Sequence, residues 1–112
     1  MRFKIHTATR LALIFLLALA TSAPAPAGSR KSVSIAQMKF APDTLDIKIG
    51  DTVVWTNSDD RDHTVVAQNG AFKSDNIRPG STFIYQFSKA GTFTYGCSYH
   101  PRMTGKIMVS EK

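Results

Sequence analysis

The sequence predicts an all-β fold, a small antiparallel sandwich or barrel. Apolar residues alternate with polar ones in several short runs after residue 31, and this period of two is typical of half-buried strands. Glycine, proline and aspartate interrupt these runs about every eight to twelve residues, a spacing typical of antiparallel sandwiches and barrels. One short helical turn is expected after the leader, near residues 74–78.

Each expected strand is defined by the apolar residues that share one of its faces. Because side chains alternate between the two faces of a strand, each set should lie on the core side. Along the chain, the sets are Val33 and Ile35; Leu45, Ile47 and Ile49; Val53 and Trp55; Phe83, Tyr85 and Phe87; Phe93, Tyr95 and Cys97; and Ile107 and Val109. A further strand is expected at 64–66, after the polar loop 58–62. The turn signals are Gly50-Asp51, Pro79-Gly80, Gly91 and Gly105.

The first 27 residues have the pattern of a secretory signal peptide. Residues 1–10 contain three basic side chains and no acidic one, and residues 11–20 are continuously apolar. An Ala-x-Ala site follows, which predicts cleavage after Ala27. The alternative is a retained membrane anchor, but the apolar run is about half of the ~20 residues that span a bilayer. We therefore expect a signal peptide at 1–27 and a mature domain at 28–112 that is exported to the periplasm.

The mature part is long enough for one domain with one core. The chain has 14 Lys and Arg and 8 Asp and Glu. The leader removes three bases and no acid, which leaves 11 basic and 8 acidic residues and a formal charge of +3. This mild charge, without a basic stripe, does not favour nucleic-acid binding.

Cys97 is the only cysteine of the chain. It therefore cannot form an internal disulfide, on which small exported domains often depend. Three interpretations are open: an inert buried thiol, an intermolecular disulfide, or a metal ligand. The count alone favours the inert thiol.

The residues around this cysteine favour a metal site. The segment Cys97-Ser98-Tyr99-His100-Pro101-Arg102-Met103 places a thiol, an imidazole and a thioether at intervals of three residues, in a loop before the last strand. His63 is the other histidine of the mature domain, since His6 belongs to the leader. Two imidazoles, a thiolate and a weak thioether form the ligand set of a blue-copper site. Each residue alone has an ordinary explanation, and methionines more often pack in cores, as we expect for Met38 and Met108.

This motif, an upstream histidine at a strand start, and the preceding strand Trp55-Thr56-Asn57 resemble the cupredoxins. The even spacing is similar to the amicyanin branch; plastocyanin and pseudoazurin are related. The resemblance extends from about residue 33 to 109. It implies a Greek-key β-sandwich or barrel of about 7–8 strands. It also implies one type 1 copper ion, cycling between Cu(I) and Cu(II), with the ligands His63, Cys97, His100 and Met103.

The resemblance further implies a role for each ligand. Cys97 would bind as the thiolate, His63 would be the more buried ligand, His100 would be the exposed path for electrons, and Met103 would be the long axial ligand. Backbone N–H groups near Cys97, and Asn57, are expected to support the site.

Two departures from the family pattern affect the surroundings of the ligands. Many cupredoxins have Asn directly after the first histidine, whereas this chain has Thr64, whose hydroxyl can replace only part of that hydrogen bonding. The interval from His63 to Cys97 is also shorter than in amicyanin. Tyr99 and Pro101 suggest an apolar docking patch, with Arg102, Lys73 and Arg61 as charged edges.

These observations predict a monomeric carrier of single electrons. By resemblance to amicyanin, its redox partners would be a periplasmic dehydrogenase as donor and a c-type cytochrome as acceptor, with no nucleic acid and no membrane insertion. An enzyme is disfavoured because copper enzymes of this class need more histidines than the mature domain has. A copper-delivery protein is the main alternative. Zinc at a His₂Cys site is another, although methionine is a poor zinc ligand.

Overall fold

The computed structural model describes Arg2 and residues 28–112, and it confirms the all-β fold class. The predicted signal peptide, apart from Arg2, lies outside the described residues, so the boundary at Ala27 stays a prediction. Among the residues that the structure describes, no helix is long and apolar enough to cross a membrane.

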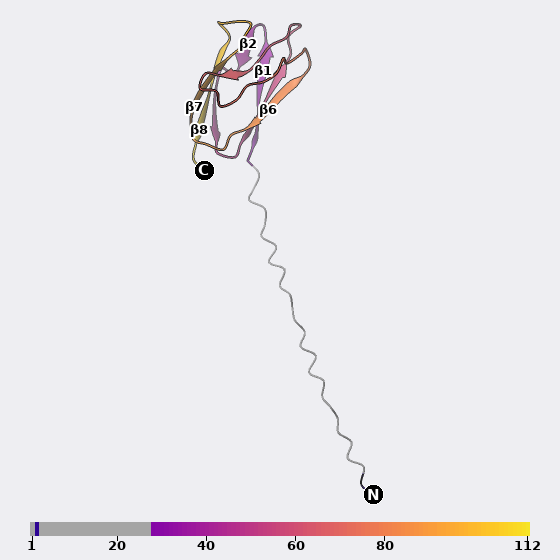
Figure 1. Ribbon diagram of the computed structural model, residues 1–112, viewed down its shortest axis with the longest axis vertical. Helices are drawn as coiled ribbons and strands as arrows, with labels where there is room; N and C mark the ends of the chain where they lie inside the picture. The colour runs from indigo at the N-terminus through magenta and orange to yellow at the C-terminus, as the bar shows by residue number, and fades with distance from the viewer. Residues whose placement is uncertain (1, 3–27) are drawn as a thin grey trace.

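Eight strands in this part of the chain form two four-stranded sheets that make a sandwich (Figure 1). The strand orders are β2-β1-β4-β6 in one sheet and β3-β8-β7-β5 in the other. The strands are β1 Arg30–Ala36, β2 Lys39–Ala41, β3 Thr44–Lys48, β4 Thr52–Asn57, β5 Val66–Ala67, β6 Thr82–Gln86, β7 Gly91–Gly96 and β8 Thr104–Ser110.

The expected antiparallel arrangement is only partly correct. β1 pairs with β4, and β3 pairs with β8, in parallel, while the other pairs are antiparallel. The reason is that the chain passes from one sheet to the other between β2 and β3, so β4 returns beside β1 in the same direction. Alternation of apolar residues defines the faces of a strand but does not define its partner.

The alternating apolar positions form the core between the sheets, as predicted. Trp55 is fully buried and lies 5.5 Å from Phe83 and 5.6 Å from Tyr95, measured between ring centroids. The prediction that Met38 and Met108 pack in the core is wrong, because they are 37% and 43% exposed. Met108 alternates with buried neighbours in β8 and therefore faces outward, and Met38 lies in the turn between β1 and β2.

The segment 74–78 is not helical, contrary to expectation. Its backbone pairs instead with the chain around His63: Ile77 N–H donates to His63 O at 2.8 Å, and Ser74 N–H donates to Val65 O at 2.9 Å. These bonds satisfy N–H groups that a short helix would leave without partners in its first turn. The strand expected at 64–66 is shorter and begins later, at Val66–Ala67, and His63 forms an isolated bridge with Ile77.

Candidate metal centre

The loop that carries the Cys-His-Met motif joins β7 to β8. Gly96 pairs with Thr104 at its base, and Cys97 N–H donates to Met103 O at 3.3 Å. Within the loop, His100 N–H donates to Cys97 O at 3.4 Å, and Met103 N–H donates to His100 O at 2.9 Å. These bonds close two successive four-residue turns, 97–100 and 100–103, which share His100. The three-residue spacing of the motif therefore places the three side chains at the corners of these turns.

His63 comes from the other ligand segment, which follows β4. Its backbone is fixed by two hydrogen bonds with Ile77. The fully buried side chain of Asn57 holds the loop 58–62, which precedes His63. Asn57 Nδ2 donates to Arg61 O at 2.7 Å and to Ile77 O at 2.8 Å, and Asn57 Oδ1 accepts from Asp59 N–H at 2.9 Å. Asn57 thus supports the site by shaping the loop rather than by touching a ligand atom.

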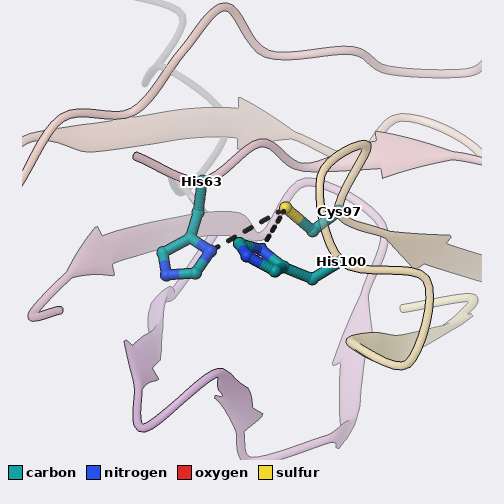
Figure 2. A group of neighbouring side chains, drawn as sticks. All are labelled: His63, Cys97 and His100. Carbon is teal, nitrogen blue, oxygen red and sulfur yellow. Dashed lines mark hydrogen bonds between the residues drawn. The ribbon is translucent and has the colours of Figure 1, made fainter. Parts of the chain in front are cut away.

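Figure 2 shows the side chains of His63, Cys97 and His100 pointing toward one another. Cys97 Sγ lies 3.8 Å from His63 Nδ1 and 3.7 Å from His100 Nδ1, and the three atoms all lie within 4.8 Å of one another. A metal about 2.0–2.3 Å from nitrogen and sulfur ligands, in a trigonal arrangement, would separate N from S by about 3.7 Å. The spacing and the chemistry of these atoms therefore fit a type 1 copper ion.

The four predicted ligands differ in burial. His63 is fully buried, Met103 is 3% exposed and Cys97 is 6% exposed, whereas His100 is only partly buried. The expectation that His63 is more buried than His100 is confirmed. The structure brings three predicted ligands together and places Met103 at the end of the same loop.

The surroundings of Cys97 favour the thiolate. Burial raises the pKa of this thiol, but hydrogen bonds from Thr64 N–H, His63, Tyr99 N–H and His100 outweigh it and lower the pKa to about 6. Thr64 N–H lies 3.4 Å from the sulfur. Because the thiolate is the form that binds metals, the protein prepares this ligand before metal arrives.

Thr64 also ties the two ligand segments together. Its Oγ1 accepts from Ser98 N–H at 2.8 Å and lies 3.1 Å from Ser98 Oγ. Thr64 itself is buried. Although this position lacks the asparagine of many cupredoxins, Thr64 still links the His63 segment directly to the Cys97 loop.

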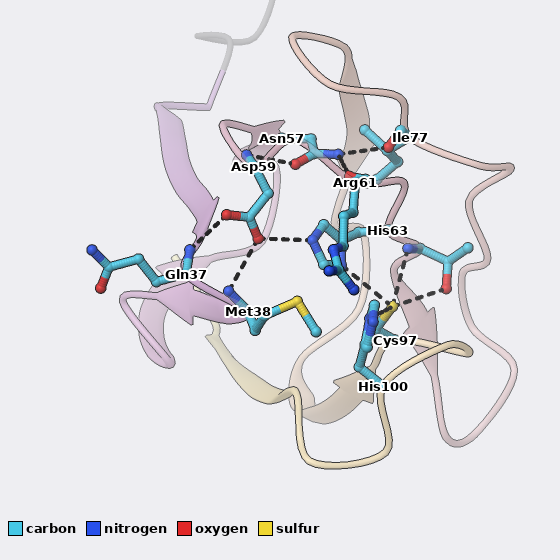
Figure 3. Close-up of polar contacts among 10 residues, drawn as sticks. Gln37, Met38, Asn57, Asp59, Arg61, His63, Ile77, Cys97 and His100 are labelled. Carbon is cyan, nitrogen blue, oxygen red and sulfur yellow. Dashed lines mark hydrogen bonds and ion pairs between the residues drawn. The ribbon is translucent and has the colours of Figure 1, made fainter.

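Asp59 is a site residue that the sequence analysis missed. Its Oδ2 accepts from His63 Nε2 at 2.8 Å and from Met38 N–H at 3.0 Å, and its Oδ1 accepts from Gln37 N–H at 2.7 Å (Figure 3). Burial raises the pKa of this carboxyl, but the bonds from Met38, Gln37 and His63 hold it below its usual value. Nothing in the sequence distinguishes it from the other acids of loop 58–62, since all are typical of an exposed polar loop.

Comparison with known proteins shows the family of the chain. The family model for the cupredoxin-like domain matches residues 9–109. Amicyanin-alpha of Methylorubrum extorquens is 38% identical over 90 residues, which cover 76% of this chain and 75% of that protein. Amicyanin of Paracoccus denitrificans is 37% identical over 82 residues, which cover 69% of this chain and 63% of that protein, less than two thirds of its length.

A solved structure shows the same similarity to amicyanin. A methionine-to-alanine variant of amicyanin in its Cu(I) form superposes with a TM-score of 0.68 and 34% identity, covering 72% of this chain and 82% of that one. The sandwich, the two convergent ligand segments and these similarities lead to one conclusion: the chain belongs to the cupredoxin-like family, as an amicyanin-like member.

Proposed function

We propose that this chain is a carrier of single electrons rather than an enzyme, with one type 1 copper ion held by His63 Nδ1, Cys97 Sγ, His100 Nδ1 and the thioether of Met103. The observation that carries the proposal is the convergence of two imidazole nitrogens on one sulfur at 3.7 and 3.8 Å. Copper, when bound, supplies a centre that gains and loses one electron between Cu(II) and Cu(I).

The protein holds the ligands with little freedom to rearrange. Hydrogen bonds of His63 with Ile77, of Thr64 with Ser98, and within the Cys97 loop fix both segments on the rigid sandwich. The thiolate is favoured before metal binds, so no proton has to leave Cys97 at neutral pH. A site that keeps one geometry in both redox states exchanges electrons without a large reorganisation.

His100 connects this site to the surface. It lines a groove with Tyr99, Pro101 and Met38, of which Tyr99 is 51% exposed and Met38 37%. The basic residues Lys39 and Arg102 line the same groove. Lys73 belongs instead to a separate polar hollow with Asp62 and Thr64. We therefore infer that redox proteins dock over His100. The resemblance to amicyanin supports a periplasmic dehydrogenase as donor and a c-type cytochrome as acceptor.

The predicted signal peptide supports a periplasmic place of action. A signal peptide at 1–27 would deliver the domain 28–112 to the periplasm, where both partners would be found. N-terminal sequencing of the secreted protein tests this: a first residue near Gly28 is expected, and an intact leader on the mature protein would contradict export by cleavage.

Reduction and reoxidation by partner proteins test the proposed function against copper delivery. Mixing the Cu(II) protein with a reductant and then with an oxidised cytochrome c should give rapid single-electron transfer with copper retained. A delivery protein would instead lose its copper to a chelating acceptor while exchanging electrons slowly. Electron exchange also separates the remaining alternative, because Zn²⁺ has no redox chemistry and a zinc protein would neither take up nor release an electron.

A further inference from the structure

The two-residue turn between β1 and β2 has an unusual backbone. Ala36 pairs with Lys39, so Gln37 and Met38 form the whole turn. Their φ angles are 52° and 60°, values that hairpins of this length require but that residues other than glycine and asparagine rarely adopt. Consecutive N–H groups in a turn of this kind can form a concave site for an anion.

A carboxylate from another element occupies that concave site. Asp59, in the loop after β4, accepts the N–H of Gln37 at 2.7 Å and the N–H of Met38 at 3.0 Å. Its side chain is 15% exposed, and its Oδ2 also lies 2.8 Å from His63 Nε2. The carboxylate is therefore fixed from one side by the β1–β2 turn and contacts the ring of His63 on the other (Figure 3).

This contact determines which ring nitrogen of His63 carries the proton. An imidazole that donates from Nε2 to a carboxylate has its lone pair on Nδ1, and His63 Nδ1 is the atom that faces Cys97 Sγ. A carboxylate in this position also makes the imidazole a stronger electron donor. Its negative charge stabilises the more positive of two oxidation states at a neighbouring centre.

We propose that Asp59 is a positioning residue of the copper site, which fixes the tautomer and orientation of His63 and lowers the midpoint potential. The proposal rests on the proposed function, because it assumes that His63 is a copper ligand. The turn of Gln37 and Met38 is its anchor. Met38 also lines the groove beside His100, so the anchor is part of the proposed docking surface.

The test compares Asp59→Asn with Asp60→Asn. Both remove one negative charge from the same loop, but Asp60 is exposed. Compared with Asp60→Asn, Asp59→Asn should shift the equilibrium between Cu(II) and Cu(I) about tenfold further toward Cu(I). This shift corresponds to a rise in midpoint potential of about 59 mV for one electron. Its affinity for Cu(II) should fall about 10- to 100-fold. Asp59→Glu, which keeps the charge, should lie closer to the wild type. Equal shifts in Asp59→Asn and Asp60→Asn would overturn the proposal.

A second measurement uses the metal-free wild-type protein and does not depend on variants that fold. Nitrogen NMR of the neutral ring of His63 should show the proton on Nε2, with Nδ1 unprotonated. A proton on Nδ1 would overturn the proposal even if the copper protein carries electrons. Conversely, a colourless Cu(II) complex with the expected tautomer would refute the proposed function and leave the contact between Asp59 and His63 established.

Discussion

Gly105 lies at the base of the ligand loop, and any side chain at this position is expected to destabilise the domain. A Cβ at this position would overlap with Cζ and Oη of Tyr95. The ring of Tyr95 is 1% exposed and is packed by Phe40 at 4.7 Å and by Trp55 at 5.6 Å, measured between centroids. The ring is therefore held between neighbouring rings, and either this packing or the strand would have to shift.

The loss of stability expected for Gly105→Ala follows from this geometry. Overpacking a buried site costs about 1–3 kcal/mol, and Gly105→Ala should lie at the upper end because the clash is with a rigid ring. About 3 kcal/mol in a domain of this size lowers Tm by about 12–24 °C, from about 4–8 °C per kcal/mol. The domain should still fold, since small domains have about 5–15 kcal/mol of stability.

Thermal unfolding of the metal-free protein measures this effect. A double-mutant cycle with Tyr95→Leu locates it, because Gly105→Ala should cost less once the ring is absent. A fall in Tm of less than about 4 °C, which is less than about 1 kcal/mol, would refute the reasoning. An equal cost in both backgrounds would show that the clash with Tyr95 is not its cause.

The remaining predictions concern the site itself. Thr64→Val keeps the side-chain shape but leaves Ser98 N–H without its partner, so the free energy of unfolding should fall by about 1–2 kcal/mol in denaturant titrations; an unchanged midpoint would contradict the link between the loops. In the metal-free protein, alkylation of Cys97 should reach half its maximal rate near pH 6, well below the 9.0 of an ordinary thiol. Because the folded pKa is lower than the unfolded one, the thiolate should add stability that is complete above pH 9 and is lost as pH falls through 6; Cys97→Ser should remove this slope, and a slope that persists would assign it to another group. Met103→Leu should change the visible spectrum and the midpoint potential, whereas Met108→Leu, on the exposed face of β8, should change neither; equal effects would exclude a special role for Met103.

The sequence predicts the faces of the strands well because burial imposes a period of two on it. Val33, Ile35, Ile107 and Val109 are buried as expected. Alternation contains no information on which strands are neighbours, so the two parallel pairs were not predictable. Met108 follows the same rule, since its position between two buried residues places it outside, and its apolar character alone misled the prediction.

The site shows the same division between local and long-range information. Cys97, His100 and Met103 lie within one loop, and their spacing matches two successive turns, so the sequence contains most of what defines them. Asp59 depends on a contact with a turn 21 and 22 residues away. Asp59 reaches this turn only because β1 and β4 pair, and no local pattern in the sequence predicts that pairing.

The visible absorption spectrum of the copper-loaded protein tests the central claim most directly. One equivalent of Cu(II) should give an intensely blue protein that bleaches on reduction with its copper retained, and Cys97→Ser should abolish the colour. A Cu(II) complex without this absorption, or an unchanged spectrum in Cys97→Ser, would contradict a type 1 site built on His63, Cys97 and His100.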